Sequence, residues 1–557
     1  MDIKDITACL IALTLATGGA TAQGTLEDYR RAYSLHDKFN ATRVYDDPAE
    51  IRWDNDSVFH YSTYTAEGRA YHIGTADGKA DAANVRAVHM DALAALLARE
   101  TGKEVRRETL VLDRFATDAT RPEGIAFRYG GFRWIVEQAC GDSLRLAEKK
   151  PLPPERPREN TRHWMEVDDE RDAAPVPSPD GKLRAYIKND NVYVCDADGK
   201  NERALSNDGT AGNYYSSWIK WSPDGKKVCT NKIRPAAKRY VHYVESSPAS
   251  QLQPILHRQE YAKPGDELRF KVPCVFHVES GKAVIPSTEL FNRQYDLYGP
   301  EWSEDSRTLT FEYNERGHQT YRMLELDAET GDVRTLVEET SPTFVVYNRI
   351  FRHKLKDGKR MLWTSERDNW NHLYMIDLEK GSVDRQITRG EWVVRQVLKV
   401  DEDRQAIYFA ASGVNPGEDP YHIHYYRIGM DGKDMVCLTP EPGNHTAVFN
   451  KDFTLLIDKY STVDRAPVTL LRGTANPEDC RTLSRADISL LEKDGWTPPE
   501  VFAAPGRDGK TPMWGIIQRP TNFDPQKTYP VIEYIYAGPG DAYTPKSFAP
   551  YNWNMTA

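Results

Sequence analysis

Two charged stretches carry the side chains best suited to binding a polar ligand. Glu315 and Arg316 follow one apolar run, and Glu366 and Arg367 follow a later one. Each pair stands where a predicted strand ends, so these groups could line a central cavity and bind the charged ends of a peptide. Ion pairing between neighbouring strands is an equally good interpretation, because strand-end charges commonly satisfy cross-strand partners. Both interpretations stay open at this point.

The sequence predicts no metal site and no cofactor. His422 and His424 alternate along a predicted strand and therefore share a face, but no third ligand can be identified beside them. The cysteines are widely scattered and form neither a C-x-x-C pair nor a Cys/His cluster at zinc spacing. The glycines Gly506 and Gly509 are typical of a turn, and we do not interpret them as a phosphate-binding loop.

The elements that must position these residues come from a recurring unit. Each copy has a short strand, a turn built on Pro-Asp-Gly or an equivalent, and further strands that end in another turn. The spacing of the copies is typical of β-propeller blades with four strands each. We predict a mainly β chain with about eight blades, centred on residues 51–73, 125–134, 177–199, 221–226, 302–331, 361–377, 406–432 and 449–471. Residues 85–99 are alanine-rich with helical spacing, which predicts an inserted helix.

The two ends of the chain differ from this repeat. Residues 1–22 resemble an export signal, with an apolar stretch followed by Ala20-Thr21-Ala22 as the cleavage site. The propeller is predicted to occupy residues 23–498, with a solvated connection at residues 151–158. From residue 499 to 557 the pattern changes to that of the first strands of an α/β domain that is incomplete. We expect an exported protein, periplasmic or extracellular.

Composition and charge exclude other classes of partner. The formal net charge of −10 over 557 residues is a mild acidic excess without long runs of one sign, so we expect no nucleic-acid binding. No segment after the signal is long and apolar enough to insert in a membrane. The expected partner is a peptide substrate, and a homodimer is left open.

The stretch from Trp363 to Tyr374, which reads WTSERDNWNHLY, resembles the dipeptidyl peptidase IV branch of the prolyl oligopeptidase family. Further stretches agree with that family in order along the chain, at residues 387–394, 407–409, 443–445 and 529–539. The resemblance as a whole covers nearly the whole expected mature chain. The resemblance implies a propeller that caps an α/β-hydrolase domain, with the substrate held between them.

The resemblance also implies a Ser-Asp-His triad on the hydrolase side, with the serine on a G-x-S-x-G elbow. This sequence contains no G-x-S-x-G, so we expect the chain to be inactive alone. One catalytic group does fall within it: Tyr536 matches the family tyrosine that donates to the oxyanion. Aminopeptidases of this branch also carry a Glu-Glu pair that holds the substrate's α-ammonium group, and residues 209–220 have no acidic pair. Release of dipeptides from a free N-terminus is therefore in doubt.

Two functions remain in competition. The first is the propeller portion of an exported serine-type peptidase that hydrolyses peptides. The second is a non-catalytic peptide- or protein-binding propeller of the cell envelope, since propellers host many unrelated functions. Coding sequence downstream of Ala557 that specifies a G-x-S-x-G would favour the first.

Overall fold

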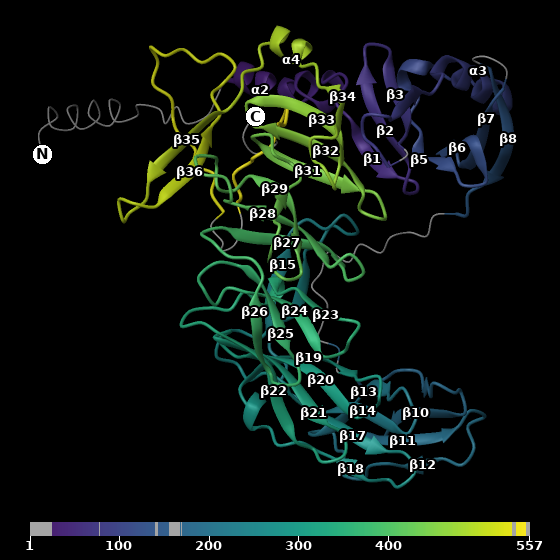
Figure 1. Ribbon diagram of the computed structural model, residues 1–557, viewed down its shortest axis with the longest axis vertical. Coiled ribbons are helices and arrows are strands. Elements are labelled where there is room, and N and C mark those ends of the chain that lie inside the picture. Colours follow the sequence, from purple (N-terminus) through teal and green to yellow (C-terminus); the bar gives the residue numbers. More distant parts are fainter. Residues whose placement is uncertain are drawn as a thin grey trace, which may run out of the picture.

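The computed structural model describes residues 25–76, 78–139, 143–154, 168, 170–536 and 542–552. The predicted signal at residues 1–22, the second half of the predicted connection at 151–158, and the Ala537-Gly538-Pro539 motif lie outside these residues. Within the described residues the chain is a β-propeller of eight four-stranded antiparallel sheets, as the sequence predicts (Figure 1).

The first four blades take up the N-terminal half of the propeller. Their strands are, for blade 1, β1 (Ala49–Trp53), β2 (Val58–Thr65), β3 (Gly68–Thr75) and β4 (Asn84–Ala87); for blade 2, β5 (Asp113–Asp118), β6 (Arg121–Tyr129), β7 (Phe132–Gln138) and β8 (Leu144–Pro151); for blade 3, β9 (Val176–Pro177), β10 (Leu183–Lys188), β11 (Asn191–Asp196) and β12 (Arg203–Ala204); and for blade 4, β13 (Tyr214–Trp221), β14 (Lys227–Arg234), β17 (Phe270–His277) and β18 (Ala283–Val284).

The other four blades follow without interruption. Their strands are, for blade 5, β19 (Gln294–Trp302), β20 (Thr308–Glu315), β21 (Thr320–Asp327) and β22 (Val333–Thr340); for blade 6, β23 (Arg352–Lys354), β24 (Arg360–Ser365), β25 (His372–Asp377) and β26 (Ser382–Gln386); for blade 7, β27 (Val393–Asp401), β28 (Ala406–Ser412), β29 (Ile423–Gly429) and β30 (Val436–Cys437); and for blade 8, β31 (Asn444–Phe449), β32 (Leu455–Thr462), β33 (Arg465–Gly473) and β34 (Cys480–Arg485).

Helices and two hairpins complete the chain. The hairpin of β15 (Tyr240–Glu245) and β16 (Ile255–Glu260) is inserted in blade 4, and β35 (Glu500–Pro505) pairs with β36 (Pro512–Ile517) after the propeller. The helices are α2 (Leu26–Lys38), α3 (Met90–Thr101) and α4 (Ser489–Lys493), with 3-10 turns at η1 (Ala41–Arg43), η2 (Arg107–Thr109), η3 (Glu289–Phe291) and η4 (Tyr347–Arg349).

The turn between the first two strands of a blade shows why the repeat folds as it does. In blade 3 the Ser178 hydroxyl donates to Asp180 (2.7 Å) and accepts from the Leu183 amide (3.0 Å). Gly181 takes a positive φ of 72°, which glycine tolerates without strain. The same serine–aspartate bond recurs at Ser222–Asp224 and Ser303–Asp305. The motif thus closes each hairpin with its own side chains.

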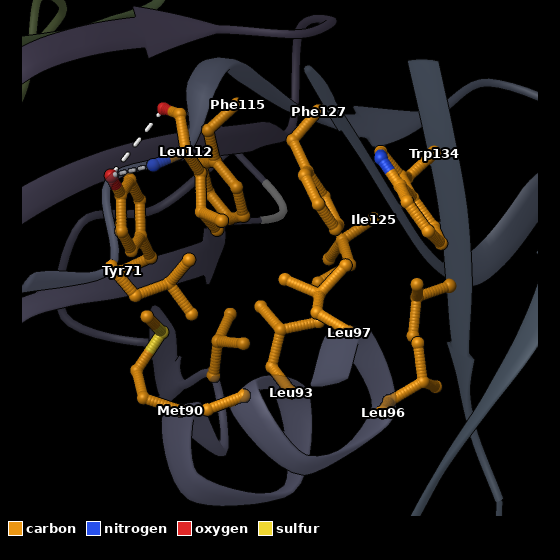
Figure 2. Close-up of a cluster of buried hydrophobic side chains, with 14 of the residues drawn as sticks. Tyr71, Met90, Leu93, Leu96, Leu97, Leu112, Phe115, Ile125, Phe127 and Trp134 are labelled. Atoms are coloured by element: carbon orange, nitrogen blue, oxygen red, sulfur yellow. Dashed lines mark hydrogen bonds between the residues drawn. The ribbon is translucent and has the colours of Figure 1, made fainter. Parts of the chain in front are cut away.

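The cores of the propeller lie between neighbouring blades. Between blades 1 and 2 the leucines of α3 pack beneath Trp134 and Phe127 (Figure 2). A helix is therefore confirmed within the region predicted at 85–99. It starts only at Met90, because residues 84–87 form the outer strand of blade 1. Comparable clusters join blades 3 to 8 in succession and blade 8 to blade 1.

Blades 2 and 3 are the two ends of an arc. No core cluster of the described residues joins their sheets, and they stand apart at the upper and lower right of Figure 1. The link between them runs through residues outside the described part of the chain.

Candidate functional site

One face of the propeller collects the connections that carry the predicted site. The strands of each blade are antiparallel and follow one another in order, so the turn from the second to the third strand and the link to the next blade leave the sheet at the same end. We call this end the connector face. Glu315 and Arg316 begin the β20–β21 turn, and Glu366 and Arg367 begin the β24–β25 turn. All four therefore lie on the connector face of neighbouring blades 5 and 6.

Arg367 is held in one orientation by a buried carboxylate. Its Nη2 donates to Glu339 Oε1 (2.5 Å) and its Nε donates to Ser365 Oγ (2.8 Å). Glu339 is only 6% exposed and also accepts from Trp363 Nε1 (2.9 Å) and Ser365 Oγ (2.6 Å). Among the described residues none bonds Nη1 of Arg367. A partly exposed, preorganised guanidinium group of this kind can donate to a ligand carbonyl or carboxylate.

A second buried carboxylate lies beside the first. Glu312 accepts a short hydrogen bond from the Tyr321 hydroxyl, and Arg352 Nε lies 2.5 Å from its other oxygen. Tyr321 stands opposite Glu339 in the register of β21 and β22, which brings the two carboxylates into one inter-blade region. Burial raises the pKa of Glu312, although the bonds from Tyr321 and Arg352 oppose this change. The polar groups here are thus mutually satisfied and rigid.

The other predicted residues differ in their partners. Glu315 forms an ion pair with Arg293 (3.2 Å), just as Arg367 forms one with Glu339. Arg316 has no ion pair with any residue that the structure describes. Glu366 is exposed, and partial desolvation, with the charge of Glu339 added, raises the pKa of its carboxyl. The structure thus brings the four residues to one face, and their binding of a peptide stays a prediction.

The connector face of blades 5 and 6 also carries an aromatic cluster that was not predicted from the sequence. The His318 ring lies 4.5 Å from Tyr295, 5.2 Å from Phe344 and 5.0 Å from Tyr347, between ring centres. Tyr295 and Phe344 are 41% and 43% exposed, and burial lowers the pKa of His318, which favours the neutral ring. These residues come from a strand, a turn and an inter-blade link with no common spacing, so no sequence pattern connects them. Together they offer an apolar surface beside the charged groups.

Tyr536 is the last residue of the described range 170–536 and follows the β35–β36 hairpin. Its side chain is 72% exposed, and its ring centre is 5.3 Å from that of Tyr543. Residues 531–536 form no strand, and Val531 and Ile532 are more than 90% exposed. The predicted hydrolase strand at this position is therefore absent from the described structure, since no neighbouring described strand pairs with it. The oxyanion role of Tyr536 stays a prediction.

Residues 209–220, which have no acidic pair of their own, contact a carboxylate from another part of the chain. Glu170 Oε2 accepts from Ser216 Oγ (2.5 Å), while Arg269 Nη1 and Lys271 Nζ approach its other oxygen at 3.4 and 3.7 Å. Because two cations already compensate this carboxylate, it is a poor receptor for a further ammonium group. The sequence could not reveal this contact, since the two partners come from separate segments of the chain.

The described residues contain neither a membrane-spanning helix nor a cluster of metal-binding side chains. No helix among them is both long and apolar enough to cross a bilayer. No three His, Cys, Asp or Glu side chains within the described ranges gather in a way that could hold a metal ion.

Comparisons with known proteins agree with this architecture. The chain matches the dipeptidyl peptidase IV N-terminal region over residues 150–467. It is 24% identical to the probable dipeptidyl-aminopeptidase B of Aspergillus fumigatus over 443 residues, covering 70% of this chain and 47% of that protein. It is 28% identical to human dipeptidyl peptidase 8 over 163 residues, covering 28% of this chain and 18% of that protein.

The chain spans about half the length of the first curated relatives that it matches. The crystal structure of Porphyromonas gingivalis dipeptidyl peptidase 4 superposes with a TM-score of 0.51 at 18% identity, covering 92% of this chain and 70% of that one, which shows a shared fold. The family match extends over more than half of the chain. This protein therefore belongs to the family defined by the dipeptidyl peptidase IV N-terminal region.

Proposed function

We propose that this chain is the propeller portion of an exported serine-type peptidase that hydrolyses peptides, and that the connector face of blades 5 and 6 binds the substrate. The observation that carries the proposal is the contact between Asp419 on blade 7 and Lys546 (2.6 Å). Asp419 lies in the β28–β29 connection, which is a second-to-third strand turn like those that carry Glu315 and Glu366. The contact therefore supports one face for both the substrate groups and the segment that follows Tyr536.

The reach of the chain is compatible with this arrangement. Lys546 lies ten positions after Tyr536, and a fully extended chain of that length spans at most about 36 Å. The proposal therefore requires Tyr536 to lie within that distance of the contact between Asp419 and Lys546. If the tyrosine donates to an oxyanion, the substrate carbonyl must come to this same side.

On this proposal, the nucleophile comes from residues that this sequence does not contain. Acyl transfer requires a serine with a histidine base, and the family elbow G-x-S-x-G is not present in these 557 residues. The proposed contribution of this chain is therefore to bind and orient the peptide, with Arg367 and Arg316 as donors to its carbonyl or carboxylate groups. The aromatic cluster around His318 would take an apolar side chain.

Two assays on the purified chain test the proposal. The first follows hydrolysis of chromogenic proline- and alanine-containing peptides, free and N-blocked, with a serine-reactive phosphonate probe alongside. We expect neither turnover nor labelling. Turnover with labelling inside the chain would mean that the nucleophile lies within these residues and would overturn this assignment.

The second assay measures binding of fluorescent peptides by anisotropy. We expect Arg316→Ala and Arg367→Ala each to weaken binding about tenfold, the change that loss of about 1.4 kcal/mol produces. Arg334→Ala is the matched control, because Arg334 also pairs with a glutamate of blade 5, Glu325, but at the other end of β22. Equal binding by all three variants and the parent chain would contradict the proposed surface.

Export is tested separately by the mature N-terminus. Expression in a bacterial host that secretes proteins should yield a chain that begins at Gln23, after cleavage behind Ala22. Intact-mass analysis of the secreted protein measures this directly. A product that retains residues 1–22 in the cytoplasm would argue against export.

A further inference from the structure

The segment after the propeller returns to the connector ends of blades 7 and 8. Lys546 Nζ lies 2.6 Å from Asp419 Oδ2, and the two side chains are only 11% and 8% exposed. The same ammonium group lies 5.0 Å from the ring centre of Tyr421, on the same loop. A nearly buried ion pair over an aromatic ring fixes the position of a lysine much more firmly than a surface pair does.

The two residues after Lys546 contact blade 8. The Asn444 side-chain amide donates to Ser547 Oγ (2.8 Å), and the Phe548 amide donates to Ser461 Oγ (3.0 Å). The side-chain oxygen of Asn444 accepts from the Ile423 amide (2.8 Å), so this one residue links blade 7, blade 8 and the segment. Three consecutive residues are therefore bound by polar groups of two blades.

Apolar contacts continue the same attachment. Phe548 and Tyr551 pack on a small core formed by α2, η1 and α4, and the ring centres of Trp496 and Phe548 are 5.4 Å apart. Trp496 Nε1 also donates to the carbonyl of Pro550 (3.1 Å). The segment is thus held over residues 546–551 and not at a single point.

One carboxylate preorganises the loop that carries Asp419. Glu418 accepts from His422 (3.0 Å) and the Gly443 amide (2.7 Å) through Oε1, and from Asn415 and His424 (both 3.0 Å) through Oε2. Four donors converge on this one side chain from both ends of the loop and from the link to blade 8. These contacts fix the backbone at the adjacent Asp419 without any bond from Lys546.

We propose that Asp419, Asn444 and Ser461 form a docking seat for residues 546–548, that Glu418 holds this seat in shape, and that the seat is the positioning element through which the propeller places the segment carrying Tyr536. The partner that fits the seat is a lysine followed by a small hydroxyl residue and an aromatic one, as Lys546-Ser547-Phe548 supplies. The consequence for Tyr536 rests on the function proposed above, whereas the seat itself does not.

Trypsin provides a direct readout in the full chain. The bond after Lys546 is open to trypsin only when its side chain leaves Asp419, whereas Lys527 is 70% exposed and serves as an internal reference. We expect Asp419→Asn and Glu418→Gln to raise the rate of cleavage after Lys546, relative to that after Lys527, by about tenfold, the change that a loss of about 1.4 kcal/mol produces. Lys546→Arg alone keeps both the charge and the cleavage site, and should keep the slow rate of the parent chain.

The matched control is Glu339→Gln, which removes the charge of another buried carboxylate on blades 5 and 6. It should lower the stability of the propeller while leaving cleavage after Lys546 unchanged. Should Asp419→Asn unfold the chain, Ser461→Ala removes a single seat contact and should still speed cleavage. An unchanged cleavage ratio in Asp419→Asn and Ser461→Ala, with both variants folded by circular dichroism, overturns the seat.

The outcome is independent of the proposed function. Peptide binding through Arg316 and Arg367 can be absent while residues 546–548 stay protected from trypsin. Conversely, peptide binding can be present while the bond after Lys546 is cleaved rapidly. In the longer peptidase that we propose, a released seat should lower kcat with KM less affected, because the oxyanion donor and not the binding surface is displaced.

Discussion

His424 Nε2 lies 3.0 Å from Glu418 Oε2, while its Nδ1 lies 2.6 Å from the carbonyl oxygen of Thr439. Both neighbours are hydrogen-bond acceptors, so the doubly protonated, positively charged imidazole satisfies both of them. Burial opposes that charge, but the contacts with Cys437, Glu418 and Thr439 outweigh it and raise the pKa of His424 to about 10. Burial would raise the pKa of Glu418, but the hydrogen bonds from His422, His424, Asn415 and the Gly443 amide hold it well below its ordinary value.

This ion pair predicts a loss of stability at alkaline pH. The folded pKa of His424 is raised above its unfolded value of about 6.5, so its contribution is fully present below pH 6.5 and is lost as pH rises through about 10. Across that window the free energy of unfolding should fall by about 1.4 kcal/mol per pH unit from this one group. Denaturant titrations between pH 6 and 10 measure the slope.

The control for this prediction is His424→Asn, which keeps a donor but cannot be charged. It should be less stable than the parent at pH 6.5 and should show a flatter dependence on pH above it. Equal slopes for the two proteins would mean that other groups cause the alkaline loss.

Tyr71→Phe tests the core between blades 1 and 2. The Tyr71 hydroxyl accepts from the Leu112 amide at 2.7 Å in a fully buried site (Figure 2). Removing the hydroxyl leaves that amide unpaired, which costs about 1–3 kcal/mol. Thermal and denaturant unfolding measure the change. Tyr33→Phe, at an 81% exposed residue, should be neutral, and a comparable loss there would contradict this account.

The repeat could be predicted from the sequence because it depends on local chemistry. The Pro-Asp-Gly turns and their equivalents identify several hairpins by themselves, whereas the first two blades were predicted from their strand patterns. The expected number of about eight blades agrees with the eight four-stranded sheets of the structure. The helix beside blade 1 was extended too far toward the N-terminus, since residues 84–87 pair with β3 instead of continuing the helical pattern. Pairing partners of a strand are tertiary information that periodicity does not contain.

The candidate site was less predictable for the same reason. Glu366 and Arg367 follow a recognisable strand, but Glu339, which fixes Arg367, comes from another blade and carries no motif. The contacts of Lys546 with Asp419 join residues more than a hundred positions apart. Sequence spacing reveals what lies on one strand or turn, whereas these contacts depend on how sheets pack.

Glu339→Ala tests the polar group that fixes Arg367. The substitution leaves the indole of Trp363 and the guanidinium of Arg367 without their acceptor in a buried site, and we expect a loss of about 3 kcal/mol. Glu338→Ala is the neighbouring control, because Glu338 is 44% exposed and an exposed pair contributes less than about 1 kcal/mol. Similar effects of both substitutions on the unfolding midpoint would contradict the buried network.

The last prediction concerns thiol reactivity. Cys229 and Cys274 are free and buried in the sheet of blade 4, and burial raises the pKa of both thiols, that of Cys274 to about 12. Since the thiolate is the reactive form, neither should react at neutral pH while blade 4 is folded. Cys480 is exposed on the outer strand of blade 8 and should react in the folded protein without denaturant.

Mass spectrometry after pulsed alkylation at rising denaturant follows the exposed thiol and the two buried thiols in one experiment. Label on Cys480 should appear without denaturant, and label on Cys229 and Cys274 should appear together at the midpoint of global unfolding. Label on the two buried thiols well below that midpoint would show that blade 4 opens alone. In that case the continuous cores on either side of the blade would not unfold as one cooperative unit, contrary to what their packing implies.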